Sequence, residues 1–229
     1  MFYRFVRLLA RLLVALQMRL TVVGAGNVPR SGAVLLVSNH LGTIDPLPIA
    51  VRLQRELRML GKVEIFRWPL LGWLARAVRA VPVRRGEADR EALRAVTALL
   101  GNDQCVLVFP EGTYIYPPAP SMMLPVKTGA AWLALKTGAA VVPIAITGTE
   151  RVWTPARGWR PWHRPPVRVT FGQPYRPMPP AGLPTRAALR AVAEDMAHRI
   201  AAMLPPEYRG YYATHSTLPS HTEVPAAQP

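Results

Sequence analysis

The chain has 229 residues, of which 50% are hydrophobic, and this length allows one sizeable hydrophobic core but excludes two large domains. Lysine and arginine number 28 against 13 acidic residues, so the formal net charge is +15. A charge of this size attracts anionic partners: nucleic acid, anionic lipid or phosphorylated substrates. Cys105 is the single cysteine, which excludes an internal disulfide framework.

Residues 1–18 are predicted to form an amphipathic helix. At ~100° per residue the arginines share one arc of this helix, and leucine, valine and phenylalanine cover the rest. The arginines also leave no uncharged stretch near the ~18 residues of a membrane span, and they do not fit a cleaved secretory signal. We expect a helix that lies in a membrane interface. Docking on the domain's own core is the alternative that remains open.

Short β-rich runs then alternate with longer helical patterns. Strands are expected at 20–23, 33–38, 57–60, 80–84, 105–109, 140–147 and 167–171. Helices are expected between them at 45–54, 68–79, 87–100, 127–137 and 185–204. This alternation predicts an α/β fold, a single layered domain over residues 19–204 with a largely parallel mixed sheet flanked by helices. Residues 205–229 carry five prolines and little apolar pattern, and they predict a disordered Pro-rich tail.

The turn after the strand at 33–38 holds a histidine and an aspartate. His40 lies in this turn, and Asp45 opens the next helix with Pro46 at its first position. Acyl transfer from a thioester to an alcohol needs a base, and a neutral imidazole held by a carboxylate suits this near neutral pH. The pattern therefore fits His40 as the base and Asp45 as its orienting partner. A plain helix cap at Asp45 and an ordinary loop histidine explain the same residues.

A second strand end carries Glu and Gly. The buried run 106–109 stops abruptly at Pro110, Glu111 and Gly112. Ligands in open α/β sheets collect at the carboxyl ends of strands, so Glu111 is expected to hold a substrate hydroxyl. Gly112 lets backbone amides approach a ligand closely. An ordinary turn from strand to loop is the other interpretation of this segment.

These two segments resemble motif blocks of the glycerolipid acyltransferase family, which includes the bacterial 1-acyl-sn-glycerol-3-phosphate acyltransferases. The family has four such blocks, and segments that resemble all four occur in this chain in the family's order. His40 and Asp45 match the family's His-four residues-Asp motif, and residues 109–113 match its Phe-Pro-Glu-Gly-Thr block. Segments that resemble its second and fourth blocks stand at 61–64, 69–72, 81–86 and 141–144. The resemblance covers roughly residues 20–175.

The resemblance implies direct transfer without a covalent acyl-enzyme, metal or cofactor, with acyl-CoA or acyl-carrier protein as co-substrate. It implies that the paired Arg84 and Arg85 hold the acceptor's phosphate, with Arg85 the better match, because a forked guanidinium fits phosphate oxygens. Other residues of the matching blocks are implied in binding the acceptor: Glu111, Gly112 and Thr113. Apolar residues of the fourth block are implied in shaping the acyl site: Val142, Pro143 and Ile144.

One residue departs from the family pattern. Family members usually carry Arg after Glu-Gly-Thr, whereas this chain has Tyr114. The change removes one phosphate contact and adds aromatic surface beside the site. The acceptor is therefore expected to be bulkier or less charged than lysophosphatidate.

We predict an enzyme that is peripheral to the cytoplasmic face of the cell membrane. Its expected partners are an anionic membrane surface, a lysophospholipid acceptor and an acyl thioester donor. Stretches rich in Trp and Arg at 66–79 and 153–162 suit the headgroup zone of a bilayer. Such stretches also fit stacking on nucleic acid, but no nucleic-acid motif is visible, so this partner is not expected. A non-catalytic lipid-binding protein on the same fold is the alternative function.

Overall fold

The computed structural model describes residues 2–77, 79–84, 89–114, 122–152, 163–182 and 185–214. Its strands are β1 (Arg19–Val23), β2 (Val34–Ser38), β3 (Leu57–Lys62), β4 (Val81–Val83), β5 (Cys105–Val108), β6 (Ala140–Thr147) and β7 (Pro166–Phe171). Its α-helices are α1 (Phe2–Gln17), α2 (Pro46–Ala50), α3 (Pro69–Ala77), α4 (Arg90–Gly101), α5 (Gly129–Thr137) and α6 (Thr185–Met203). Short 3-10 turns are η1 (Ala25–Asn27), η2 (Val63–Arg67), η3 (Thr149–Arg151), η5 (Pro206–Tyr208) and η6 (Gly210–Tyr212).

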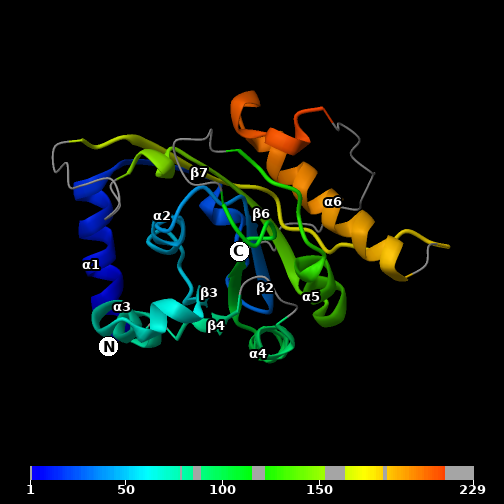
Figure 1. Cartoon of the computed structure of the whole chain (residues 1–229), viewed down its shortest axis with the longest axis horizontal. Coiled ribbons are helices and arrows are strands. Elements are labelled where there is room, and N and C mark those ends of the chain that lie inside the picture. The colour runs from blue at the N-terminus through cyan, green and yellow to red at the C-terminus, as the bar shows by residue number, and fades with distance from the viewer. Residues whose placement is uncertain are drawn as a thin grey trace.

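The strands form one seven-stranded sheet in the order β1-β7-β6-β2-β5-β3-β4 (Figure 1). Neighbouring strands are parallel, except that β6 and β7 are antiparallel. The predicted α/β fold with a largely parallel mixed sheet is therefore confirmed. Strands β2 and β5 are buried along their whole length, as is typical of parallel strands with helices on both faces. Helix α5 contacts both α4 and α6, α4 contacts β5 and α6 contacts β6, while α1 and α2 lie on the other side of the sheet in Figure 1.

The strand register decides which residues meet at the sheet's carboxyl edge. Val37 of β2 pairs with Val108 of β5, so the turns that follow these two strands start side by side. His40 and Glu111 follow these strands directly and are brought to the same place. Because β1 and β7 run opposite to β6, their first residues also lie at this edge. The start of β1 at Arg19 therefore shares the sheet edge with His40.

Helix α1 forms as predicted, and two of its arginines bind backbone carbonyls of the domain. Arg7 Nη1 donates a hydrogen bond to Leu53 O at 3.0 Å, and Arg11 Nε donates to Val51 O at 3.2 Å. These carbonyls lie just beyond the carboxyl end of α2, where backbone acceptors lack intrahelical partners. A small apolar cluster beside these contacts contains Val14, Met18, Val51, Val152 and Val167. The leucines of α1 face outward and remain exposed: Leu8, Leu9, Leu12, Leu13 and Leu16.

The carboxyl-terminal prediction is wrong for residues 205–214. The turns η5 and η6 follow α6 there, and they place Tyr208 and Tyr212 in the core. Tyr212 Oη accepts a hydrogen bond from the Val126 amide at 3.0 Å, so this segment is held against the domain. Two buried tyrosines supply the apolar area that the low overall hydropathy of the segment concealed. The rest of the predicted tail, residues 215–229, lies outside the described residues.

Candidate active site

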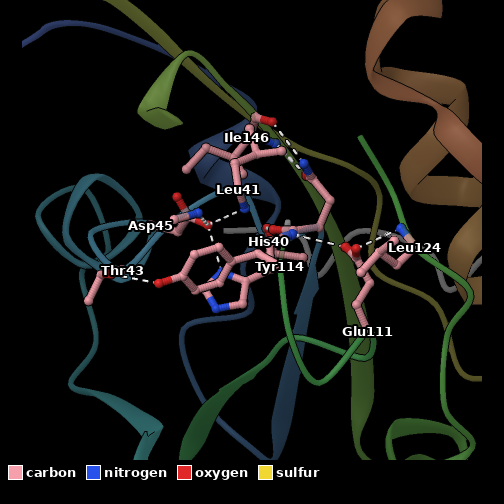
Figure 2. A network of polar contacts seen from close by, with 11 residues as sticks. His40, Leu41, Thr43, Asp45, Glu111, Tyr114, Leu124 and Ile146 are labelled. Atoms are coloured by element: carbon pink, nitrogen blue, oxygen red, sulfur yellow. Dashed lines mark hydrogen bonds and ion pairs between the residues drawn. The ribbon is translucent and has the colours of Figure 1, made fainter. Parts of the chain in front are cut away.

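The turn after β2 brings His40 and Asp45 into direct contact (Figure 2). His40 Nδ1 lies 2.7 Å from Asp45 Oδ2, and both side chains are buried. The same carboxylate oxygen accepts hydrogen bonds from the amides of Leu41 at 2.6 Å and Gly42 at 3.0 Å. In the described part of the chain, Asp45 makes no capping hydrogen bond to α2. The carboxylate therefore organises the histidine turn, and the plain helix cap is not what forms.

This arrangement assigns separate tasks to the two ring nitrogens of His40. An acceptor-only carboxylate at Nδ1 favours the tautomer that carries its proton on Nδ1, an assignment made from the hydrogen-bond network. The other nitrogen, Nε2, is then left with its lone pair. A neutral imidazole in this state can take a proton from a hydroxyl group.

Aromatic rings fix the plane of the imidazole. Phe109 stacks on His40 with ring centroids 4.0 Å apart and an interplanar angle of 15°. Tyr114 approaches edge-on at 4.6 Å and 72°, and its phenol oxygen lies 2.9 Å from Thr43 Oγ1. Figure 2 shows Tyr114 reaching from the loop after β5 across the histidine turn. Tyr114, marked as a departure in the sequence, is thus a direct neighbour of His40.

Glu111 supports the histidine turn from the opposite side. Its Oε1 accepts the His40 amide at 2.9 Å, and its Oε2 accepts the Leu124 amide at 2.7 Å (Figure 2). Burial raises the pKa of Glu111 to about 8; the two amides oppose the rise, and the nearby Asp45 carboxylate adds to it. Both carboxylate oxygens are engaged by backbone amides in this structure. Contact of Glu111 with a substrate hydroxyl stays a prediction.

The glycine of the same block has a conformational role. Gly112 has φ of +72°, a left-handed conformation that disfavours side chains, and a Cβ atom built there would lie 3.1 Å from Lys127 Nζ. Lys127 therefore extends beside the loop that carries Glu111. Thr113 next to it is exposed. Lys127 was not predicted as a site residue. The one signal for it in the sequence was the rarity of lysine, since the chain has only three lysines.

Asn39 is a second residue that the sequence interpretation missed. Its Nδ2 donates to Ile146 O at 2.9 Å, and its Oδ1 accepts from Ile146 N at 2.8 Å. The side-chain amide thus forms the two hydrogen bonds that the backbone of a neighbouring strand would form, and it holds the histidine turn against β6. The signal available in the sequence was a polar residue between a buried strand and the candidate base His40.

The predicted phosphate-binding pair is placed only in part. Arg84 follows β4, with an exposed side chain and an amide that donates to Asp89 Oδ2 at 2.8 Å. Because β4, β3, β5 and β2 are parallel, Arg84 lies at the same sheet edge as His40. Arg85 lies outside the described residues.

The predicted acyl-site residues lie in β6. Val142 and Ile144 belong to the main core cluster and are fully buried, and Pro143 between them is buried as well. Their side chains pack within the domain, behind the histidine turn that Asn39 binds to the same strand. A wall of the acyl site made by these three residues stays a prediction.

Comparison with known proteins extends these findings. A family model described as Acyltransferase matches residues 19–147. The 1-acyl-sn-glycerol-3-phosphate acyltransferase of Bacillus subtilis is 25% identical over 199 residues, which cover 86% of this chain and 94% of that protein. The lyso-ornithine lipid O-acyltransferase of Pseudomonas aeruginosa is 35% identical over 143 residues, 61% of this chain and 51% of that protein.

A solved structure agrees with both. The crystal structure of the 1-acyl-sn-glycerophosphate acyltransferase PlsC from Thermotoga maritima matches with a TM-score of 0.64 and 26% identity, covering 84% of this chain and 75% of that one. The matched family region is more than half of the chain, and it contains the His40–Asp45 turn and Glu111. We conclude that the chain belongs to the Acyltransferase family.

Proposed function

We propose that the protein transfers a fatty acyl group from acyl-CoA or acyl-carrier protein to the free hydroxyl of a lysophosphatidate-like glycerolipid in phospholipid synthesis. The observation that carries the proposal is the buried 2.7 Å contact between His40 Nδ1 and Asp45 Oδ2 at the carboxyl edge of the sheet. The Bacillus subtilis relative, named a 1-acyl-sn-glycerol-3-phosphate acyltransferase, supports the choice of acceptor.

The geometry supports a direct transfer. His40 Nε2 takes the proton of the acceptor hydroxyl while the hydroxyl oxygen attacks the thioester carbonyl carbon, forming the new C–O bond. The tetrahedral intermediate then breaks its C–S bond, and the imidazolium returns the proton to the departing sulfur. Asp45 keeps its hydrogen bond to Nδ1 throughout and stabilises the positive charge on the ring. The products are an ester and a free thiol.

Basic residues beside the site support a phosphate on the acceptor. The Lys127 ammonium lies next to Gly112. Arg84 follows β4 directly, at the same sheet edge as His40. Guanidinium and ammonium groups are the common partners of phosphate in proteins. Arg85, whose position in the sequence matches the family's phosphate-binding arginine, is expected to join them.

A second acceptor class is favoured by Tyr114. A phenol in place of a guanidinium, hydrogen-bonded to Thr43, removes one positive charge from the acceptor side of His40. The Pseudomonas aeruginosa relative carries the name lyso-ornithine lipid O-acyltransferase. A lysolipid with a less anionic headgroup is therefore the second candidate acceptor.

Release of free thiol from an acyl thioester tests the function. With purified protein and acyl-CoA, we expect thiol release that depends on added lysolipid and is measured with a thiol-reactive dye. Lysophosphatidate and lyso-ornithine lipid, supplied separately, compare the two acceptor classes by kcat/KM. A protein that binds both lysolipids but releases no thiol with either would be a lipid-binding protein instead.

We further propose that the protein binds peripherally to the cytoplasmic face of the membrane through α1. Leu8 and Leu16 are 62% and 58% exposed, whereas Arg7 and Arg11 donate hydrogen bonds to backbone carbonyls of the domain. A surface helix of a soluble protein normally buries its leucines, so the row of exposed leucines on α1 favours an apolar environment outside the protein. The exposed Trp68 and Trp73 are suited to the same interface, whereas residues 153–162 lie outside the described ones. Among the described helices, none is long and apolar enough to cross a bilayer.

Replacing the exposed leucines tests this location without disturbing the core. The triple change Leu9→Gln, Leu12→Gln, Leu16→Gln is expected to lower partitioning onto anionic vesicles by at least about tenfold, because inserting a leucine side chain contributes ~1.5–3 kcal/mol at full burial. Vesicle flotation measures the partitioning. Met178→Gln, another exposed apolar position, is the control and should float as the unchanged protein does. Equal flotation of the triple variant would assign α1 to core packing alone.

A further inference from the structure

Two adjoining cavities lie at the far end of the sheet from β4. One, of about 650 Å³, lies between the second half of α1, the start of β1 and the end of α2. The other, of about 460 Å³, lies at the start of β7 and shares Arg19 and Arg164 with the first. We call the pair the α1–β7 cavity. Basic side chains surround it: Arg11, Arg19, Arg52, Arg151, His163 and Arg164.

The charges of the α1–β7 cavity are poorly compensated. No Asp or Glu of the described residues lines either part. Arg151 pairs with Glu150 at 3.2 Å, but the described acidic residues form no ion pair with Arg19, Arg52 or Arg164. Like charges gathered around one hollow repel each other, and a bound anion removes that cost. Guanidinium forks suit phosphate oxygens in particular.

The floor of the α1–β7 cavity is apolar. Val14, Met18 and Val51 line it and are buried in the small cluster on which α1 docks. An apolar floor beneath an arginine rim fits a molecule that joins an anionic group to an apolar part. The second half of α1 borders the cavity, and the same helix carries the exposed leucines.

The α1–β7 cavity is separate from the acceptor site. It stands at the starts of β1 and β7, which are three and two strand spacings from β2, or about 14 Å and about 10 Å along the hydrogen-bonding direction. Arg84 stands at the opposite end of the sheet, after β4. The cavity and Arg84 nevertheless both lie at the carboxyl edge of the parallel strands, because β1 and β7 run opposite to β6 and begin at that edge. The cavity and the histidine turn therefore lie at the same edge of the sheet.

We propose that the α1–β7 cavity binds the phosphate of an anionic membrane lipid that is not a substrate. This inference rests on the proposed membrane binding through α1 and adds lipid selection to it. The inserted leucines bind any bilayer, and the arginines restrict stable binding to bilayers that carry phosphate headgroups with net negative charge. The phosphates of coenzyme A share this chemistry, so the test separates the two sources.

Flotation on two kinds of vesicle tests the proposal. Vesicles of phosphatidylcholine, with or without phosphatidylglycerol, are compared for the unchanged protein and for Arg19→Gln combined with Arg164→Gln. The control is Arg94→Gln combined with Arg186→Gln, which removes the same charge from exposed positions on α4 and α6. We expect the cavity variant to lose at least about tenfold more affinity for the phosphatidylglycerol vesicles than the control, since basic residues near the surface attract anionic headgroups. Binding to phosphatidylcholine alone should not change.

Several results would overturn the proposal. Equal losses in the cavity and control variants would show that net charge, and not the cavity, selects the membrane. Loss of coenzyme A binding in the cavity variant, with vesicle binding intact, would assign the site to the acyl donor. An unchanged protein that floats on neither vesicle would overturn both this proposal and the proposed membrane location. Thiol release with a soluble short-chain lysolipid should be the same in all three proteins and shows that the variants are folded.

Discussion

Replacing His40 by alanine is expected to lower kcat by well over ~100-fold, the scale of lost general-base catalysis. The change removes Nε2, the group proposed to take the acceptor's proton, and it leaves the Asp45 carboxylate bound to the amides of Leu41 and Gly42. The turn should therefore persist, with some loss of stability because Phe109 loses its stacking partner. Thiol release with saturating lysolipid measures the effect.

His198→Ala is the matched control for this experiment. His198 lies on α6, contacts the ring of Tyr212 and takes no part in the catalytic turn, so its loss should leave kcat near that of the unchanged protein. Thermal unfolding of both variants separates damage to the fold from damage to the chemistry. Retention of most activity by His40→Ala would end the proposed mechanism.

Replacing Asp45 by asparagine should lower kcat by roughly 10²–10⁴-fold, the upper value being that of a Ser-His-Asp triad that loses its carboxylate. Asparagine keeps one oxygen that can accept from Leu41, Gly42 and His40, but it carries no charge to stabilise the imidazolium. Its amide nitrogen would take the place of Oδ1, which is buried without a hydrogen-bond partner among the described residues. The fold should therefore survive while the rate falls.

Comparison with Asp45→Ala distinguishes charge from turn geometry. Alanine removes both the charge and the oxygen that gathers the turn, so it should lower the free energy of unfolding as well as kcat. Stopped-flow rates and chemical denaturation of both variants give the two effects separately. An asparagine variant as fast as the unchanged protein would mean that Phe109 and Tyr114 orient His40 sufficiently without the carboxylate.

The contact between His40 and Asp45 was predictable because its cause is local. A buried strand, a short turn and a proline at the helix start place His40 and Asp45 five residues apart with little freedom. The rule that ligands collect at the carboxyl ends of strands indicated Glu111 as a further residue of the site. The actual partners of Glu111 were not predictable, because the Leu124 amide comes from a separate segment whose approach depends on the packing of the whole domain.

The orientation of α1 could not be predicted from the sequence for the same reason, because it depends on contacts with distant parts of the chain. Its periodicity predicted an arginine arc and an apolar arc, and both are present. Which arc faces the protein depends on acceptors that the helix sequence does not contain, the carbonyls of Val51 and Leu53. Likewise, Tyr208 and Tyr212 anchor a segment whose local composition resembles a tail, because their burial depends on the loop at Val126 and on Glu150.

The enclosure of His40 has a consequence for the fate of the acyl donor. A thioester held near a general base is open to attack by water as well as by alcohol, and hydrolysis would waste the activated chain. His40 is 4% exposed, with Phe109 stacked on its ring and the Tyr114–Thr43 hydrogen bond beside it. Little solvent reaches His40 in this state, so few water molecules can meet the proposed base. Under the proposed mechanism, the aromatic enclosure thereby favours transfer over hydrolysis.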